Sequence, residues 1–145
     1  MSLQVHQFKC LSDNYGFLIH DPVSGDTASV DTPEADAINA ALREKQWKLT
    51  HILNTHHHFD HAGGNEMLKA QWGCKIVGFD GEKAGKQAIK EGKIFADPIQ
   101  YPDRMAEITI QSLVDYFDGK QPEKLIKIPA KLYYKEDADK DPDLK

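Results

Sequence analysis

The stretch that decides the fold of this chain reads Leu49-Thr50-His51-Ile52-Leu53-Asn54-Thr55-His56-His57-His58-Phe59-Asp60-His61. Its beginning, from Leu49 to Asn54, is short and mostly apolar and predicts a buried strand. Its end, from Thr55 to His61, is rich in imidazole groups and predicts a loop that leads into a helix. Sites in α/β proteins are usually built at this carboxyl end of a strand, so we expect the functional site here.

Strands and helices are predicted to alternate on both sides of this stretch. Strands are expected at residues 4–10, 15–20, 27–30, 75–79, 94–99 and 125–134, and helices at 34–46, 65–72, 82–91 and 103–118. The helix at 103–118 has an apolar stripe that we assign to the core: Ala106, Ile110, Leu113, Val114 and Phe117. The predicted fold class is therefore α/β, a layered mixed β-sheet with an N-terminal β-meander followed by alternating β/α units.

Length and composition predict one domain with a charged tail. The chain has 145 residues, and we expect a single α/β domain at 1–134 and a solvated, charged tail at 135–145. The net charge of −5 and the lack of a long apolar run argue against nucleic acid or a membrane as partner. The N-terminus lacks the pattern of a secretory signal, so we expect a cytoplasmic protein.

The histidine-rich loop has the chemistry of a metal site. Imidazole and carboxylate suit zinc better than Mg²⁺ or Ca²⁺. In a turning segment His56 and His58 can face one metal ion, and Asp60 and His61 can face a second. Two cations about 4 Å apart can hold a hydroxide and polarise a carbonyl oxygen, which cleaves esters, thioesters and amides. A histidine-rich loop without a metal, or with an adventitious one, is the alternative.

The first half of the chain resembles a known family. Thr55 to His61 fits the T-H-x-H-x-D-H signature of the metallo-β-lactamase superfamily. Together with Leu11-Ser12-Asp13-Asn14-Tyr15 and Val30-Asp31-Thr32-Pro33, it resembles glyoxalase II, the hydroxyacylglutathione hydrolases, over residues 1–77. The resemblance implies that His56 and His58 bind one zinc ion, and that Asp60 and His61 bind the other. It also implies a shared hydroxide, with Asp60 in the catalytic centre, that attacks the thioester of S-lactoylglutathione.

The second half departs from that family. The family adds two histidines and a bridging aspartate from later elements, but no histidine follows His61 in this sequence. Residues 76–135 instead resemble the C-terminal part of periplasmic sugar-binding proteins of the ribose type, on Ile76-Val77-Gly78-Phe79-Asp80-Gly81, Ile99-Gln100-Tyr101-Pro102 and Gly119-Lys120. This resemblance implies weak ligand-binding roles for Asp80 and Gln100.

These two resemblances predict a chimera of a metallo-β-lactamase-like half, 1–77, and a periplasmic-binding-protein-like half, 78–134. The leading hypothesis is a recombined or engineered protein with a partial zinc site and little or no hydrolase activity, because a catalytic zinc normally takes three protein ligands. Asp31, Asp80 or Asp97 could substitute for a missing ligand. One alternative is a working binuclear zinc hydrolase, and another is a sugar-binding module. A homodimer would cover sheet surface that both parent families cover with other elements.

Overall fold

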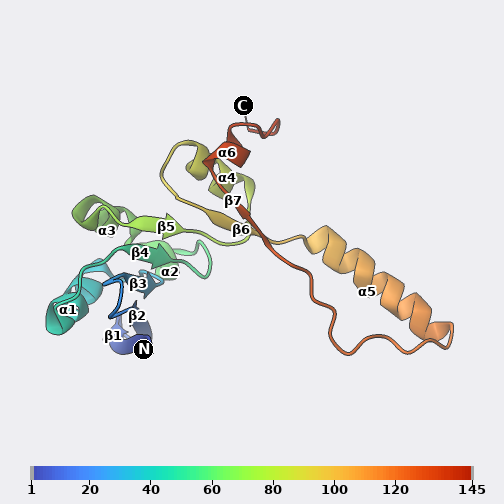
Figure 1. The fold of residues 1–145 in the computed structure, drawn as a ribbon, viewed down its shortest axis with the longest axis horizontal. Helices are drawn as coiled ribbons and strands as arrows, with labels where there is room; N and C mark the ends of the chain where they lie inside the picture. Colours follow the sequence, from blue (N-terminus) through green and yellow to red (C-terminus); the bar gives the residue numbers. More distant parts are fainter. Residues whose placement is uncertain (1, 145) are drawn as a thin grey trace.

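The computed structural model describes residues 2–144, which form a five-stranded sheet and a two-stranded sheet with helices packed around them (Figure 1). The larger sheet has the order β1-β2-β3-β4-β5. Its strands are β1 (Gln4–Cys10), β2 (Asn14–His20), β3 (Thr27–Val30), β4 (His51–Leu53) and β5 (Lys75–Val77). β1, β2 and β3 form an antiparallel meander, whereas β3, β4 and β5 are parallel. This mixed sheet confirms the predicted fold class.

Two helices, α1 (Ala35–Lys45) and α3 (Asn65–Trp72), pack on one face of this sheet. The α1 helix forms there because Ile38, Ala41 and Leu42 recur at helical spacing and present one apolar stripe to the strands. A short helix that the periodicity does not predict, α2 (Phe59–Ala62), precedes α3. The buried core between helices and strands comprises Leu18, Ile38, Leu42, Ile52, Leu68 and Ile76 among others.

The second half continues the sheet through its backbone. It contains α4 (Lys83–Lys90), β6 (Asp97–Ile99), α5 (Pro102–Phe117), β7 (Lys131–Tyr133) and α6 (Lys135–Ala138). The Gly78 amide donates to the Ala96 carbonyl at 2.9 Å, and the Phe95 amide donates to the Ile76 carbonyl at 2.7 Å. β6 then pairs with β7 in an antiparallel ribbon. Ile94 packs against the main core and against a smaller one, so side chains also join the halves.

The position of α5 differs from the prediction. The helix has nearly the predicted bounds, but it projects from the body as an arm (Figure 1), and none of its side chains is buried. The assignment of its apolar stripe to the core is therefore wrong. The physical reason is that β6 and β7, which flank the arm, pair with each other and leave the intervening segment outside the layers.

The C-terminal segment also differs from the predicted solvated tail. Residues 135–138 form α6, and both Ala138 and Leu144 are buried in the smaller core with Ile89 and Tyr133. Sparse apolar residues at the right positions are enough to fix a charged segment when a neighbouring helix, here α4, offers an apolar face. In residues 2–144, no helix has the length and apolar character needed to span a membrane.

The main core yields a stability prediction at Ile52, which is fully buried at the centre of β4. Replacement of Ile52 by alanine leaves a cavity between the sheet and α1, so we expect the free energy of unfolding to fall by about 2–5 kcal/mol. Urea unfolding followed by circular dichroism measures it. Val23→Ala, at a turn residue that is 70% exposed, is the control and should change the value by less than about 0.5 kcal/mol. An equal loss in both variants would contradict the assigned core.

Candidate functional site

The histidine-rich loop lies at the carboxyl end of the parallel strands, as the sequence predicts. It runs from the end of β4 into α2, and the Asn54 amide donates to the Val77 carbonyl at the end of β5 at 3.0 Å. Gly64, between α2 and α3, lets the backbone approach Thr32 closely, since a Cβ atom there would lie 2.9 Å from the Thr32 carbonyl oxygen. The loop is thus packed against the neighbouring strand end after β3.

The carboxylate of Asp31, just after β3, fixes this loop. Its Oδ1 accepts from the Thr55 amide at 2.7 Å, and its Oδ2 accepts from the Thr55 hydroxyl at 2.8 Å. His61 Nδ1 also lies 2.8 Å from Oδ2. Asp31 has a left-handed φ of 59°, an uncommon conformation outside glycine that aspartate tolerates better than most residues. These contacts offset that conformational cost and hold both ends of the loop on one side chain.

A second set of polar side chains supports the loop from beneath. Thr32 Oγ1 donates to Asn65 Oδ1 at 2.6 Å, Asn65 Nδ2 donates to Asn54 Oδ1 at 2.7 Å, and Asn54 Nδ2 donates to the His61 carbonyl at 3.0 Å. No role for these three residues follows from the sequence motifs. Their signal is positional, because Thr32 lies two residues after β3, Asn54 directly follows β4, and Asn65 begins α3.

The four predicted metal ligands lie together on this loop. The ring centroids of His56 and His58 are 4.7 Å apart, and those of His56 and His61 are 3.9 Å apart. Asp60 Oδ2 lies 3.3 Å from His61 Nε2. His61 thus lies between two carboxylates, with Nδ1 facing Asp31 and Nε2 facing Asp60, and because a carboxylate can only accept, a proton on Nδ1 satisfies the shorter contact. His57 contacts His58, and both of these rings are exposed.

These side chains have the donor atoms that zinc prefers, but they do not converge on one point. Nitrogen and oxygen donors are those that zinc takes, and the Asp31–His61 pair is the usual carboxylate–histidine support for a metal ligand. Within residues 2–144, however, no group of three or more His, Cys, Asp or Glu side chains converges closely enough to hold a metal ion. The ligand roles of His56, His58, Asp60 and His61 therefore stay predictions.

Two carboxylates of the second half share a pocket with the histidine loop, and one of them, Asp97, is buried. Asp97 on β6 lines a pocket of about 240 Å³ together with Asn54, His56, His57 and Glu82. Asp97 is only 2% exposed, and its Oδ1 accepts from the Gly81 amide at 3.2 Å. Burial, with smaller contributions from the charges of Asp80 and Glu82, raises the pKa of Asp97 to about 6. Asp97 thus faces the same space as His56.

The two weakly predicted ligand-binding residues lie elsewhere and contact each other. Gln100 Nε2 donates to Asp80 Oδ1 at 3.0 Å at the base of the α5 arm. This contact satisfies polar groups of both side chains within the chain. A ligand-binding role for Asp80 and Gln100 stays a prediction.

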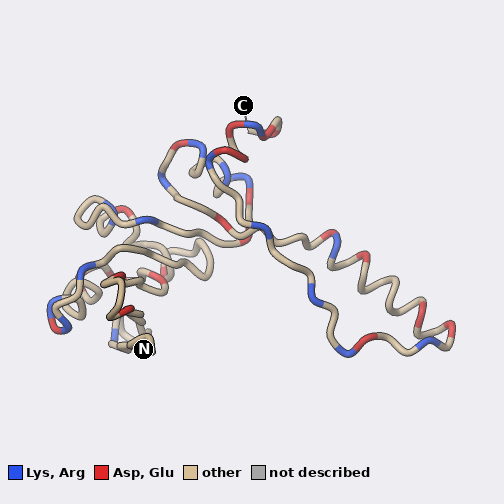
Figure 2. The backbone as a smooth tube through the Cα atoms, viewed as in Figure 1, with Lys and Arg blue, Asp and Glu red and all other residues tan. Residues whose placement is uncertain are grey.

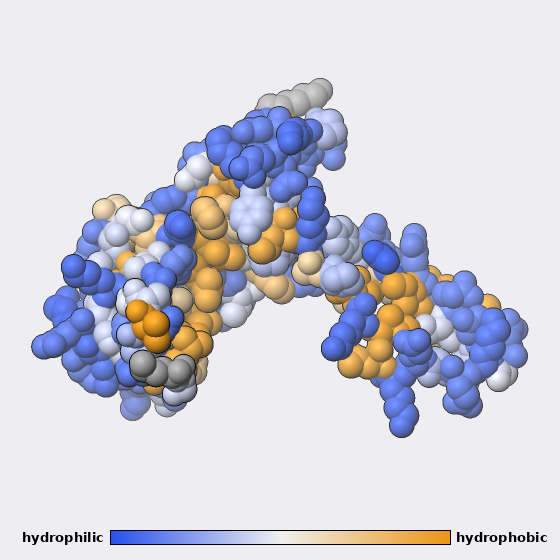
Figure 3. Space-filling model, in the orientation of Figure 1, coloured by the Kyte–Doolittle hydropathy of each residue, from blue (hydrophilic) through white to orange (hydrophobic). Residues whose placement is uncertain are grey.

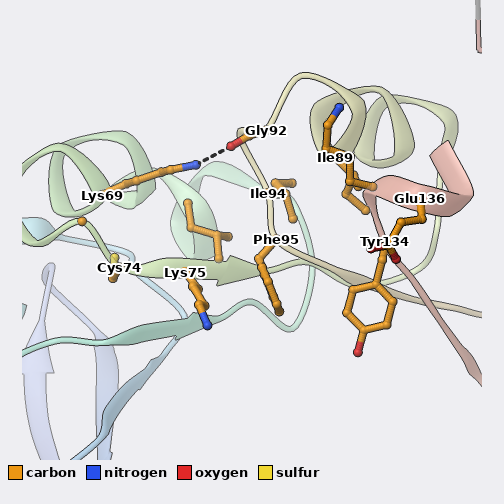
Figure 4. A pocket seen from close by; sticks show the side chains of 12 residues that line it. Lys69, Cys74, Lys75, Ile89, Gly92, Ile94, Phe95, Tyr134 and Glu136 are labelled. Carbon is orange, nitrogen blue, oxygen red and sulfur yellow. Dashed lines mark hydrogen bonds between the residues drawn. The ribbon is translucent and has the colours of Figure 1, made fainter. Parts of the chain in front are cut away.

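A larger pocket lies at the opposite end of β5 from the histidine loop. It measures about 640 Å³ and lies between Cys74, Lys75 and Ile76 on one side and Phe95 and Tyr134 on the other (Figure 4). Its lining is apolar with lysine amines at the edge, and Lys69 Nζ donates to the Gly92 carbonyl at 2.9 Å. None of the predicted metal ligands lines this pocket, so its size does not indicate the reactive centre.

A family model supports the ancestry that the loop indicates. The model of the metallo-beta-lactamase superfamily matches residues 18–104, which is more than half of the chain. The chain belongs to the metallo-beta-lactamase superfamily. The match extends past residue 77, where the sequence pattern predicts the resemblance to end.

Curated relatives carry the name hydroxyacylglutathione hydrolase. The relative from Maricaulis maris is 61% identical over 75 residues, which cover 52% of this chain and 29% of that protein. The relative from Bradyrhizobium sp. is 43% identical over 108 residues, 74% of this chain and 42% of that protein. The chain spans well under half of the length of either relative.

A solved structure of another kind is similar in fold. An ABC transporter periplasmic solute-binding protein from Actinobacillus succinogenes, with bound D-allose, superposes with a TM-score of 0.55 at 14% identity. The superposition covers 73% of this chain and 37% of that one. At this identity the similarity concerns the α/β fold alone.

The raised pKa of Asp97 predicts a pH dependence of stability. A folded-state pKa of about 6, against 3.8 for the unconstrained group, means that the folded chain holds this proton more tightly than the unfolded chain does. The free energy of unfolding should therefore fall as pH rises from about 4 to above about 6, by a total of about 3 kcal/mol. Asp97→Asn, whose amide oxygen can still accept from Gly81, should remove this loss and be the more stable chain near pH 8.

Urea unfolding of both chains across this pH range measures the effect. Glu123→Gln, at an exposed position, removes the same charge and should leave the pH profile unchanged. An Asp97→Asn chain that keeps the full pH dependence would show that another group causes it.

Proposed function

We propose that this chain is a metal-dependent hydrolase of the hydroxyacylglutathione hydrolase type, which binds zinc through His56, His58, Asp60 and His61 and cleaves a thioester such as S-lactoylglutathione. The observation that carries the proposal is the contact of these four side chains on one loop that Asp31 anchors. The superfamily match and the names of the curated relatives support the same reaction class.

The side chains of the loop have separable roles in this proposal. Asp31 orients the His61 ring, so that Nε2 faces Asp60 and would be the nitrogen that donates to the metal. His56 and His58, in edge contact, supply the second pair of donors. A bound zinc ion would polarise the thioester carbonyl and provide hydroxide at neutral pH. The pocket shared by His56, Asn54 and Asp97 offers space for the acyl group beside these donors.

A second candidate is a recombined chain that binds zinc without turnover. It is favoured by the absence of any histidine after His61 in the sequence and by the similarity in fold to a periplasmic solute-binding protein. With two donors for each metal ion, the chain falls short of the three that a catalytic zinc normally takes. The two candidates agree on metal binding and differ on hydrolysis, so separate measurements are needed.

Zinc binding is the first prediction of the proposal. We expect the purified chain to bind zinc and its melting temperature to drop when a chelator removes the ion, since a ligand of the folded state stabilises that state. His58→Ala should weaken zinc affinity on the order of tenfold or more, by titration calorimetry. His57→Ala removes the neighbouring exposed imidazole and is the matched control, with little expected change. Equal effects of the two substitutions would indicate unspecific binding by a histidine-rich loop.

Hydrolysis of S-lactoylglutathione by the zinc-loaded chain is the second prediction. We expect loss of thioester absorbance that a chelator abolishes and that Asp60→Asn reduces by on the order of 100-fold, because the amide is a poor donor to a cation. A rate equal to buffer with zinc alone, in a chain that demonstrably holds the metal, would reject hydrolysis and leave the second candidate.

A further inference from the structure

The arm α5 exposes an apolar stripe that the rest of its own chain does not cover. Ile110 is 63% exposed, Leu113 is 53% exposed and Phe117 is 81% exposed. Most helices in proteins depend on burial of an apolar face rather than on propensity alone. A continuous exposed stripe of this kind marks an interaction surface.

A second apolar surface lies on the sheet, on the face opposite α1 and α3. We call it the open face. The strand register places Phe17, Val30, Leu53 and Val77 opposite one another in a single row across β2 to β5. Phe17 is 38% exposed and Leu53 is 37% exposed, whereas Ile52, whose side chain points to the helices, is fully buried.

The two surfaces match in size and charge. The row spans three strand spacings, about 14 Å, and the stripe from Ala106 to Phe117 is about 17 Å long. The α5 helix carries three acidic residues and one basic residue, Arg104. These charged residues are spaced along its length (Figure 2). The open face has a lysine on each of its outer strands. Lys9 on β1 pairs with Tyr15, which lies on the same face of β2 as Phe17, and Lys75 lies on the same face of β5 as Val77. Opposite charges therefore flank two apolar strips.

The arm and the sheet stand apart in the single chain. The arm extends to one side of the β6–β7 ribbon and the larger sheet lies on the other (Figure 1), and hydrophobic residues border the open angle between them (Figure 3). The accessible surface of the chain is 9800 Å², whereas a compact monomer of 16.4 kDa exposes about 7,500 Å². Burial of this excess, about 2,300 Å² per chain, would give a total interface of about 4,600 Å², which lies within the range of obligate homodimers.

We propose that the occupant of the open face is the α5 arm of a second copy of this chain, in a symmetric dimer in which each arm lies across the sheet of its partner. A two-fold axis relates the two copies, so the same contact is made twice and both stripes and both open faces are covered. The arm joins the body through segments that belong to no strand, at residues 100–101 and 118–130, so it can reach the other chain without breaking a strand. This proposal does not depend on zinc or on hydrolysis.

Light scattering coupled to gel filtration tests the proposal on the purified chain. We expect a mass about twice 16.4 kDa. Leu113→Glu on the arm and Phe17→Glu on the open face should each weaken dimerisation on the order of 100-fold and shift the mass to one chain. Gln111→Glu adds the same charge to the far side of α5 and should leave the dimer intact. Because Leu113 is 53% exposed and no residue of α5 is buried, its substitution should leave the circular dichroism of the monomer unchanged.

Cross-linking locates the contact. Chains with Leu113→Cys and chains with Phe17→Cys, mixed and oxidised, should form a disulfide between the two kinds of chain and not within one. A monomeric mass for the unsubstituted chain would overturn the proposal, and so would closure of the arm onto its own sheet. A dimer that survives both charge substitutions would overturn it as well, because another surface would then join the copies.

Discussion

The carboxylate of Asp31 is the contact on which the functional end of this molecule depends. It lies after β3, and it holds residues 24 and 30 positions further along the chain, at the start and end of the histidine loop. Parallel strands bring these positions to one edge, and the two oxygens of a carboxylate have enough lone pairs to accept from an amide, a hydroxyl and an imidazole at once. The left-handed backbone conformation of Asp31 is locally unfavourable, and it directs this side chain toward the loop. The loop is therefore ordered before any ligand arrives.

The order of this loop affects how readily it could bind a metal ion. A metal site built on a short loop needs its donors turned toward one point, and the entropy of turning them opposes binding. Here one donor, His61, is already oriented by Asp31, and Asp60 lies 3.3 Å from its other ring nitrogen. His56 and His58 still lie ring against ring. The site is thus half organised, which agrees with a chain that contains only the first group of histidines.

Much of the fold could be predicted from local patterns, and the errors have a common cause. The meander, α1 and the helix after the loop follow from alternation, turn residues and helical spacing, all of which act over a few residues. The apolar stripe of α5 follows from the same spacing, yet periodicity shows that a helix has an apolar face and not what covers it. Leu144 is the opposite case. One apolar residue in a charged segment gives no periodic pattern that predicts burial, yet its side chain is buried beside Ile89. The site residues were found through their type and spacing, whereas Thr32, Asn54 and Asn65 act through distant contacts that no short pattern contains.

The junction between the two halves is made largely of main chain. Gly78 and Phe95 exchange backbone hydrogen bonds with Ala96 and Ile76 across a parallel bridge, and Ile94 adds one apolar side chain to both cores. Every residue except proline can donate such a backbone hydrogen bond. The junction therefore depends on strand direction more than on the identity of the side chains. The requirements of this junction are therefore few: an exposed edge on β5 and an apolar residue at the position of Ile94. The segment beyond Val77 is held by its backbone geometry more than by its side chains.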